Sequence, residues 1–140
     1  MKKNKKKKIV YTYVCGDILH IGHLRYLKAA KKQGNYLIVG VLTDKAVKEK
    51  KPISVIPFRE RLETIEAIKY INEVVPQNTY SPFDNVKDIK PDVLVESNSH
   101  LEQPANNYVK SYGGKIVIVP YYKLQSSTKI KNKIKRIWKL

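Results

Sequence analysis

The strongest constraint on the fold is the alternation of short, unbroken apolar runs with longer segments of helical spacing. Runs of strand length lie at residues 9–14, 36–42, 92–95 and 115–119, and a further short strand is expected at 73–75. Amphipathic segments lie at residues 21–32, 57–70, 101–111 and 126–138. Continuous apolar runs are typical of strands that are covered on both faces. The pattern therefore predicts a single-domain α/β fold, a Rossmann-like doubly wound parallel sheet of about five strands.

The length of 140 residues fits one domain, which we place at residues 9–140 after a basic N-terminal tail at residues 1–8. No apolar run is long enough to cross a bilayer. The apolar stretch after the lysine run is too short for a signal peptide and lacks a cleavage site of small residues. We therefore expect a cytoplasmic protein with no membrane partner.

Positive charge is concentrated at the two ends of the chain, whose formal net charge is +16. Residues 1–8 contain six lysines, and residues 103–140 contain nine Lys and Arg, with no acidic residue in either segment. We expect the last helix to pack through Ile134, Ile137 and Trp138 and to leave most of its lysines in solvent. A basic nucleic-acid-binding module remains an alternative, because tyrosines in the basic third of the chain offer stacking surfaces.

A first candidate site directly follows the first predicted strand. There His20 and His23 flank Gly22 at the expected start of a helix. The imidazoles and the unpaired backbone N–H groups of a first helical turn can face one anion. Gly22 has no side chain, which would let a phosphate or nucleobase approach the backbone closely. The alternative is structural, with His20 capping a turn and His23 packing on the helix.

A second candidate site opens the last helix, at Ser126, Ser127, Thr128 and Lys129. Hydroxyls and backbone N–H groups at a helix N-terminus bind anions, and Lys129 adds positive charge. Ordinary capping requires only one of these residues and is the alternative. Because ligands bind at the carboxyl edge of such a sheet, we expect the two segments to form one site.

This ordered set of motifs resembles the HxGH nucleotidyltransferase superfamily and, within it, the cytidylyltransferase-like family. The similarity covers residues 9 to about 132, including the segment at 39–77. The groups it resembles are glycerol-3-phosphate cytidylyltransferase, phosphonate cytidylyltransferases, archaeal FAD synthetase, and the nucleotidyltransferase half of heptose-activating enzymes of lipopolysaccharide core synthesis. The resemblance implies an enzyme that transfers CMP or AMP from CTP or ATP to a phosphate or phosphonate oxygen of a small molecule. Pyrophosphate is released in line, without a covalent intermediate.

The resemblance also implies roles for individual residues. Those assigned to catalysis are His20, His23, Lys45 and Arg61. An arginine can bind phosphate through two N–H groups, and Arg61 could instead lie at a dimer interface. Lys50 and Lys51 compete with Lys45 for its role. Residues assigned to nucleotide and phosphate binding are Cys15, Gly16, Asp17, Gly22, Ser126, Ser127, Thr128 and Lys129.

Metal is expected to enter as Mg²⁺ with the nucleoside triphosphate. Cys15 is the single cysteine, and no Cys/His spacing suits a metal site made of protein ligands. Asp17 would organise the site and could contact the ion; its alternative reading is a turn residue after a strand.

Departures from the family pattern bear on the identity of the substrates. Gly16 stands where many cytidylyltransferases have phenylalanine, residues 96–100 replace the usual segment after the fourth strand, and the arginine before the Ser-Ser-Thr cluster is missing. Nucleobase preference and acceptor are therefore left open, as is a homodimer. A catalytically inactive nucleotide-binding protein is a further alternative.

Overall fold

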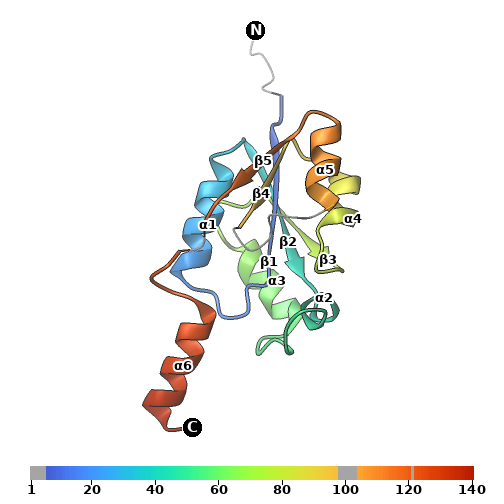
Figure 1. Ribbon diagram of the computed structural model, residues 1–140. Coiled ribbons are helices and arrows are strands. Elements are labelled where there is room, and N and C mark those ends of the chain that lie inside the picture. The colour runs from blue at the N-terminus through green and yellow to red at the C-terminus, as the bar shows by residue number, and fades with distance from the viewer. Residues whose placement is uncertain (1–5, 98–103, 121) are drawn as a thin grey trace.

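The protein is a parallel sheet covered by helices on both faces, as the computed structural model in Figure 1 shows for residues 6–97, 104–120 and 122–140. Its strands are β1 (Ile9–Val14), β2 (Tyr36–Leu42), β3 (Glu73–Gln77), β4 (Val93–Glu96) and β5 (Lys115–Ile118). They pair in the order β3-β2-β1-β4-β5, and every pair is parallel. The predicted Rossmann-like architecture with five strands is confirmed.

Two apolar cores hold helices against opposite faces of the sheet. On one face, Leu27 and Ala30 of α1 (Ile21–Lys31) and Ile65 of α3 (Phe58–Glu66) pack against β1 and β2. The opposite core includes Val86 of α4 (Phe83–Ile89) and Val109 of α5 (Pro104–Ser111), together with residues of the short helix α2 (Asp44–Lys48). The chain therefore changes face between β1 and β4, and such a switch point is where this fold binds ligands.

Two features of the helices differ from the sequence prediction. The helix expected to reach residue 70 ends at Glu66, because Asn72 is already held at the start of β2 by bonds to Leu37. Helices α2 and α4 were not predicted; each is under two turns long, so neither shows a clear helical period. The first three residues of the helix expected at 101–111 lie outside the described residues.

Residues 6–8 of the predicted tail already contact the domain. Asn35 donates to the carbonyl of Lys6 at 3.1 Å and accepts from the N–H of Lys8 at 2.6 Å, and the Lys7 ammonium lies 4.2 Å from the centre of the Tyr36 ring. Across the described residues, no helix combines the length and the apolar character needed to cross a membrane.

Helix α6 (Ser127–Trp138) leaves the domain and projects beyond it, at the lower left of Figure 1. It begins one residue after the predicted start and ends at the predicted residue, but none of its residues is buried. Ile134, Ile137 and Trp138 were expected to pack on the domain, and this expectation is wrong: their side chains are exposed.

Candidate functional site

The two histidines form a reciprocal cap at the start of α1. The Nδ1 atom of His20 accepts a hydrogen bond from the N–H of Gly22 at 3.0 Å. The backbone N–H of His20 donates in return to Nδ1 of His23 at 3.2 Å. This arrangement is a capping box, which pairs N–H groups that a helix start leaves without partners. The two imidazole rings consequently lie 4.1 Å apart, centre to centre.

The cap also decides which nitrogen of each ring carries the proton. Because Nδ1 of His20 and Nδ1 of His23 both accept hydrogen bonds, the hydrogen-bond pattern assigns the proton of each neutral ring to Nε2. Both rings thus keep an Nε2–H donor that the capping bonds do not use. The structural reading of these histidines and the anion-binding reading are therefore compatible.

Both histidines are neutral near pH 7. Burial lowers the pKa of His20 below its ordinary value. Burial, the neighbouring His20 and the charge of Lys51 lower the pKa of His23 to about 4. The pair accordingly offers oriented hydrogen bonds to a ligand without carrying full charges.

Two glycines are required by close contacts rather than by a ligand. A Cβ atom on Gly22 would lie 2.7 Å from Cε1 of His20 and 3.4 Å from Cβ of Tyr122. The space expected to admit a phosphate or nucleobase is thus filled by the histidine ring. Gly16 has a φ of +68°, and a Cβ there would lie 2.4 Å from Cδ1 of Ile65. Gly16 shapes the loop between β1 and α1, and Gly22 lets the His20 ring pack on the first turn of α1.

Asp17 ties this loop to the segment that precedes α3. Its carboxylate accepts from the backbone N–H groups of Val55 at 3.1 Å and Ile56 at 2.9 Å, and it pairs with the Lys131 ammonium at 3.2 Å. Burial alone would raise the pKa of Asp17, but these hydrogen bonds and the ion pair hold it below its ordinary value. Because these three donors engage both carboxylate oxygens, Asp17 organises the loop.

Arg61 is placed differently from the expectation of a phosphate contact. The residue is 1% exposed. Its guanidinium donates to the carbonyls of Cys15 and Leu42, each at 2.7 Å, and to the carbonyl of Ile56 at 3.0 Å. It also pairs with the Asp44 carboxylate at 2.9 Å. All three guanidinium nitrogens are thus engaged by the protein, so Arg61 is a positioning residue.

The remaining residue assigned to catalysis, Lys45, lies exposed in the first turn of α2. Thr43 caps this helix by accepting from the N–H of Ala46 at 3.2 Å. The neighbouring Asp44 is held by Arg61. The end of β2 therefore fixes the backbone beneath Lys45 while its side chain stays in solvent. Cys15, which was assigned to nucleotide and phosphate binding, is half-buried and has a free thiol. Its backbone carbonyl accepts a hydrogen bond from Arg61.

The start of α6 lies against the loop that carries the histidines. Ser126 is the N-cap and accepts from the N–H of Lys129 at 3.1 Å. Ser127 donates its hydroxyl proton to the carbonyl of Ile18 at 3.3 Å. Thr128 is exposed, and the Lys129 ammonium bonds the carbonyl of Lys123 at 2.7 Å. The predicted meeting of the two segments is present, with Ser126 and Ser127 acting first as structural contacts.

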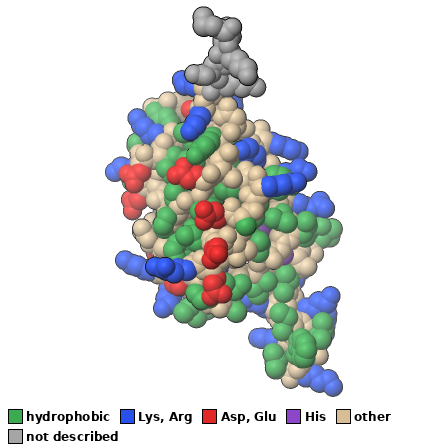
Figure 2. Space-filling model, turned by 180° about the vertical axis from the view of Figure 1, so that it is seen from behind, with side chains coloured by type: hydrophobic (Ala, Val, Ile, Leu, Met, Phe, Trp, Pro, Cys, Tyr) green, Lys and Arg blue, Asp and Glu red, His purple; other side chains and the backbone are tan. Residues whose placement is uncertain are grey.

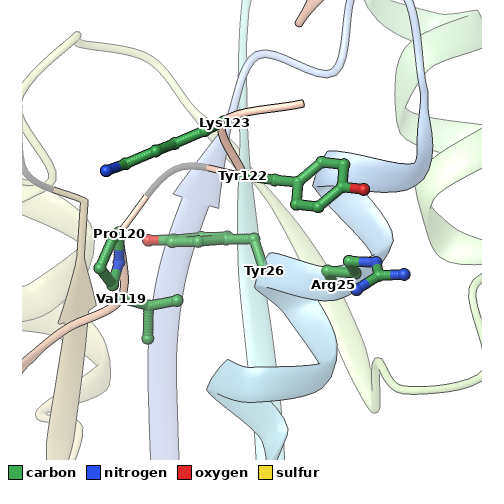
Figure 3. A pocket seen from close by; sticks show the side chains of 6 residues that line it. All are labelled: Arg25, Tyr26, Val119, Pro120, Tyr122 and Lys123. Carbon is green, nitrogen blue, oxygen red and sulfur yellow. The ribbon is translucent and has the colours of Figure 1, made fainter. Parts of the chain in front are cut away.

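A pocket of about 310 Å³ opens beside these two helix starts (Figure 3). Its walls come from α1 and from the chain that follows β5, and the residues that line it are Arg25, Tyr26, Val119, Pro120, Tyr122 and Lys123. The Arg25 guanidinium lies 4.9 Å from the centre of the Tyr122 ring. Sequence reasoning missed this pocket, although Tyr122 lies in the segment where the family arginine is missing.

The carboxyl end of β4 carries a buried acid that sequence reasoning also missed. Glu96 is fully buried and accepts from the Tyr13 hydroxyl at 2.8 Å, while its other carboxylate oxygen has no hydrogen-bond partner in the described structure. Burial raises the pKa of Glu96 to about 7, and the bond from Tyr13 opposes that shift. His100, in the segment that departs from the family, lies outside the described residues.

Comparisons with known proteins bear on the family and the fold of this chain. The model of the family described as cytidylyltransferase-like matches residues 13–134. Bifunctional protein HldE of Geobacter metallireducens is 34% identical over 97% of this chain and 29% of its own length. The corresponding protein of Gluconobacter oxydans is 35% identical over 88% of this chain and 26% of its own length. The chain thus spans under a third of these curated relatives.

One solved structure is matched over its whole length, unlike the curated relatives above. The lipopolysaccharide core biosynthesis protein from Thermoplasma volcanium superposes with a TM-score of 0.72 at 25% identity. The match covers 86% of this chain and 100% of that chain. The two chains therefore share their fold over most of this chain.

Replacing Arg61 tests its role as a positioning residue. We expect Arg61→Lys to lower the free energy of unfolding by about 2 to 4 kcal/mol, because a lysine cannot replace the planar fork and leaves buried carbonyls without donors. Urea denaturation measures the loss. Arg59→Lys is the matched control, since Arg59 is exposed on the same helix and should change stability little. Equal losses in the two variants would contradict the assignment.

The low pKa of His23 predicts a pH dependence of stability. Between about pH 6.5, its pKa in the unfolded chain, and pH 4, its pKa in the fold, the unfolded chain binds the extra proton. The free energy of unfolding should therefore fall as pH is lowered through this window, by at most about 1.4 kcal/mol per pH unit from this group.

His23→Gln isolates this contribution, because glutamine preserves the acceptor of the capping box but does not titrate. Urea denaturation of both proteins at several pH values should show the unmodified chain losing stability relative to the variant below pH 6.5. Glu96 is present in both proteins, so its opposite contribution cancels in the difference. Parallel pH curves would refute the prediction.

Proposed function

This chain belongs to the cytidylyltransferase-like family, and we propose that it transfers a nucleoside monophosphate from CTP or ATP to the phosphate of a small sugar phosphate. The family predicted from the residues is confirmed. The expectation of a nucleotidyltransferase-type enzyme is confirmed at the level of that family. The nucleotide, the acceptor and the role of each residue are our proposals.

The observation that carries the proposal is the contact between the two helix starts. The hydroxyl of Ser127 bonds the carbonyl of Ile18, two residues before His20. This contact brings the N-terminus of α6 beside the capped N-terminus of α1. Helix N-termini attract anions, and two of them at one sheet edge suit the extended charge of a triphosphate.

The proposed reaction is a single displacement at the α-phosphorus. An oxygen of the acceptor phosphate forms a bond to the α-phosphorus, and the bond from that phosphorus to the bridging oxygen of the β-phosphate breaks. Pyrophosphate leaves with the bonding electron pair. Negative charge spreads over the equatorial oxygens and the leaving group, so catalysis depends on positioned donors and needs no nucleophile from the protein.

The described residues divide into donors and supports for this step. His20 and His23 would donate from Nε2 to the phosphate oxygens, and their fixed tautomer means that no ring has to reorganise. Lys45, exposed at the end of β2, would bring a mobile positive charge to the acceptor or the triphosphate. Asp17 and Arg61 would hold the loop in register from beneath.

The pocket beside α1 would bind the nucleoside. Tyr26 and Tyr122 offer aromatic faces for a base, and Arg25 is held over the Tyr122 ring. In Figure 3, Tyr122 and Arg25 lie on one side, with Tyr26 extending toward Pro120. A base in this pocket would lie next to the triphosphate at the two helix starts.

A sugar phosphate is the acceptor class that the relatives favour. The structural neighbour from Thermoplasma volcanium is named for lipopolysaccharide core biosynthesis, and a lipopolysaccharide core is assembled from sugars. A sugar phosphate supplies the phosphate oxygen that the proposed displacement requires.

An assay of pyrophosphate release tests the proposal directly. The full chain is incubated with Mg²⁺, either CTP or ATP, and a panel of sugar phosphates, with glycerol 3-phosphate and a phosphonate as comparison acceptors. Release that depends on a sugar phosphate supports the proposed class. Nucleotide binding without turnover for every acceptor would instead favour an inactive nucleotide-binding protein.

Variants that preserve the cap test the two histidines. His20→Asn and His23→Gln can each keep the capping acceptor, but neither amide places an N–H where the imidazole Nε2 donates. We expect either change to lower kcat by roughly 10², in line with the loss of one preorganised donor. Circular dichroism and urea denaturation at pH 7.5 verify the fold. Nearly unchanged turnover in both variants would exclude the assignment.

Removal of metal tests whether Mg²⁺ travels with the substrate. Among the described residues, no group of three or more His, Cys, Asp or Glu side chains could hold an ion, so the phosphates would carry it. We expect EDTA to stop pyrophosphate release and to leave the thermal unfolding curve of the nucleotide-free protein unchanged. Excess Mg²⁺ should restore turnover. A lower unfolding temperature in EDTA would point to a structural ion.

A further inference from the structure

Helix α6 has an apolar face that the described parts of the protein leave uncovered. Ile134 is 41% exposed, Ile137 59% and Trp138 72%. Exposure rises along the helix because its first turn contacts the domain and its later turns project away from it (Figure 1). Leu140, which follows the helix, is exposed as well. This concentration of large apolar side chains calls for a partner.

The rest of the helix surface is basic. At about 100° per residue, Ile130, Ile134, Ile137 and Trp138 fall within an arc of about 100°. Outside this arc, the helix sequence contains Lys and Arg and no acidic residue. Lys131 and Lys133 border the two sides of the arc. The helix therefore joins a narrow apolar face to a mostly basic one, and Figure 2 shows apolar side chains flanked by Lys and Arg at its lower right.

Most of the basic side chains of α6 form no ion pair with the described residues of the domain. Lys131 pairs with Asp17, and the Lys129 ammonium bonds the carbonyl of Lys123. Within the described residues, the other basic side chains of this region form no ion pair; they are Lys133, Lys135, Arg136 and Lys139. These four extend beyond the turn that faces the proposed nucleotide site, so they are not needed there.

We propose that α6 lies in the plane of an anionic lipid surface, with its isoleucines and Trp138 below the headgroups and its lysines among them. A helix with Lys and Arg on one face and Trp and Ile on the other binds anionic membranes by combining apolar burial with headgroup attraction. The expected absence of a membrane partner rested on the lack of a spanning segment. Binding in the surface plane requires none.

The charges favour a lipid surface over the other candidate occupants. A second copy packed helix to helix would bring together two segments that contain basic but no acidic residues, in a chain whose net charge is already +16. A nucleic acid would neutralise the lysines but would leave Ile134, Ile137 and Trp138 in water. An anionic bilayer satisfies both faces at once, and this inference rests on α6 alone, independently of the proposed reaction.

Trp138 supplies the readout, because it is the single tryptophan of the chain. The full chain is mixed with vesicles of phosphatidylcholine alone or with added phosphatidylglycerol. We expect the tryptophan emission to shift to shorter wavelength, and the protein to sediment with the vesicles, only when phosphatidylglycerol is present. Brominated acyl chains should quench the emission, which shows insertion below the headgroups. High salt should weaken binding.

Two variants separate the apolar and the charge contributions. Ile134→Gln with Ile137→Gln should abolish sedimentation with vesicles, and Lys133→Gln with Lys135→Gln and Lys139→Gln should weaken the partition coefficient at least tenfold. The matched control removes three exposed lysines elsewhere, through Lys87→Gln, Lys110→Gln and Lys115→Gln, and should bind nearly as well as the unmodified chain. All variants alter exposed residues, and circular dichroism checks their folding.

Four results would overturn the inference. An emission shift that grows with protein concentration in vesicle-free buffer, with a dimer in light scattering, would assign the apolar face to a second copy. DNA or RNA binding that tolerates the isoleucine changes, without vesicle binding, would assign the charge to nucleic acid. Equal weakening by the α6 charge variant and its control would indicate attraction by net charge alone. No binding to anionic vesicles would reject the inference outright.

Discussion

The buried guanidinium of Arg61 is the interaction on which the rest of the site depends. One side chain bonds the loop after β1, the end of β2, the start of α2 and the segment before α3. Asp17 grips the same segment from the other side, because it accepts from the N–H of Ile56 while Arg61 donates to the carbonyl of that residue. Two buried charges of opposite sign thereby fix the loop that leads to the histidines against this segment.

The sheet could be predicted well because each buried strand leaves a continuous apolar run. β1 and β2 have the bounds that the sequence predicts, since both faces of these strands are covered. Helix α2 could not be predicted in this way, because its position depends on the Thr43 cap and on Asp44 reaching Arg61. The uncovered face of α6 escaped prediction for a similar reason: an amphipathic period shows that a helix has an apolar face but not whether the domain covers it.

The histidine motif was located correctly, but only the structure shows how its two roles combine. Capping and anion binding were set against each other as alternatives in the sequence, where a side chain is assigned one role. In the structure each imidazole uses Nδ1 for the helix start and retains Nε2. Arg61 shows the opposite outcome, in which the structural role replaces the expected one. An arginine suits phosphate, but all three guanidinium nitrogens of Arg61 bond protein acceptors, one of them 46 residues away along the chain.

The close packing of the His20 ring on Gly22 changes what the HxGH motif reports about a protein. Because the ring fills the space of a missing Cβ and caps the helix, histidine and glycine contribute to the start of this helix whether or not the chain turns over a substrate. The motif is therefore a signature of the helix start as much as of turnover. Active and inactive proteins that contain this motif would therefore differ at residues that do not take part in the cap. Lys45 and the residues that line the pocket around Tyr122 are such positions.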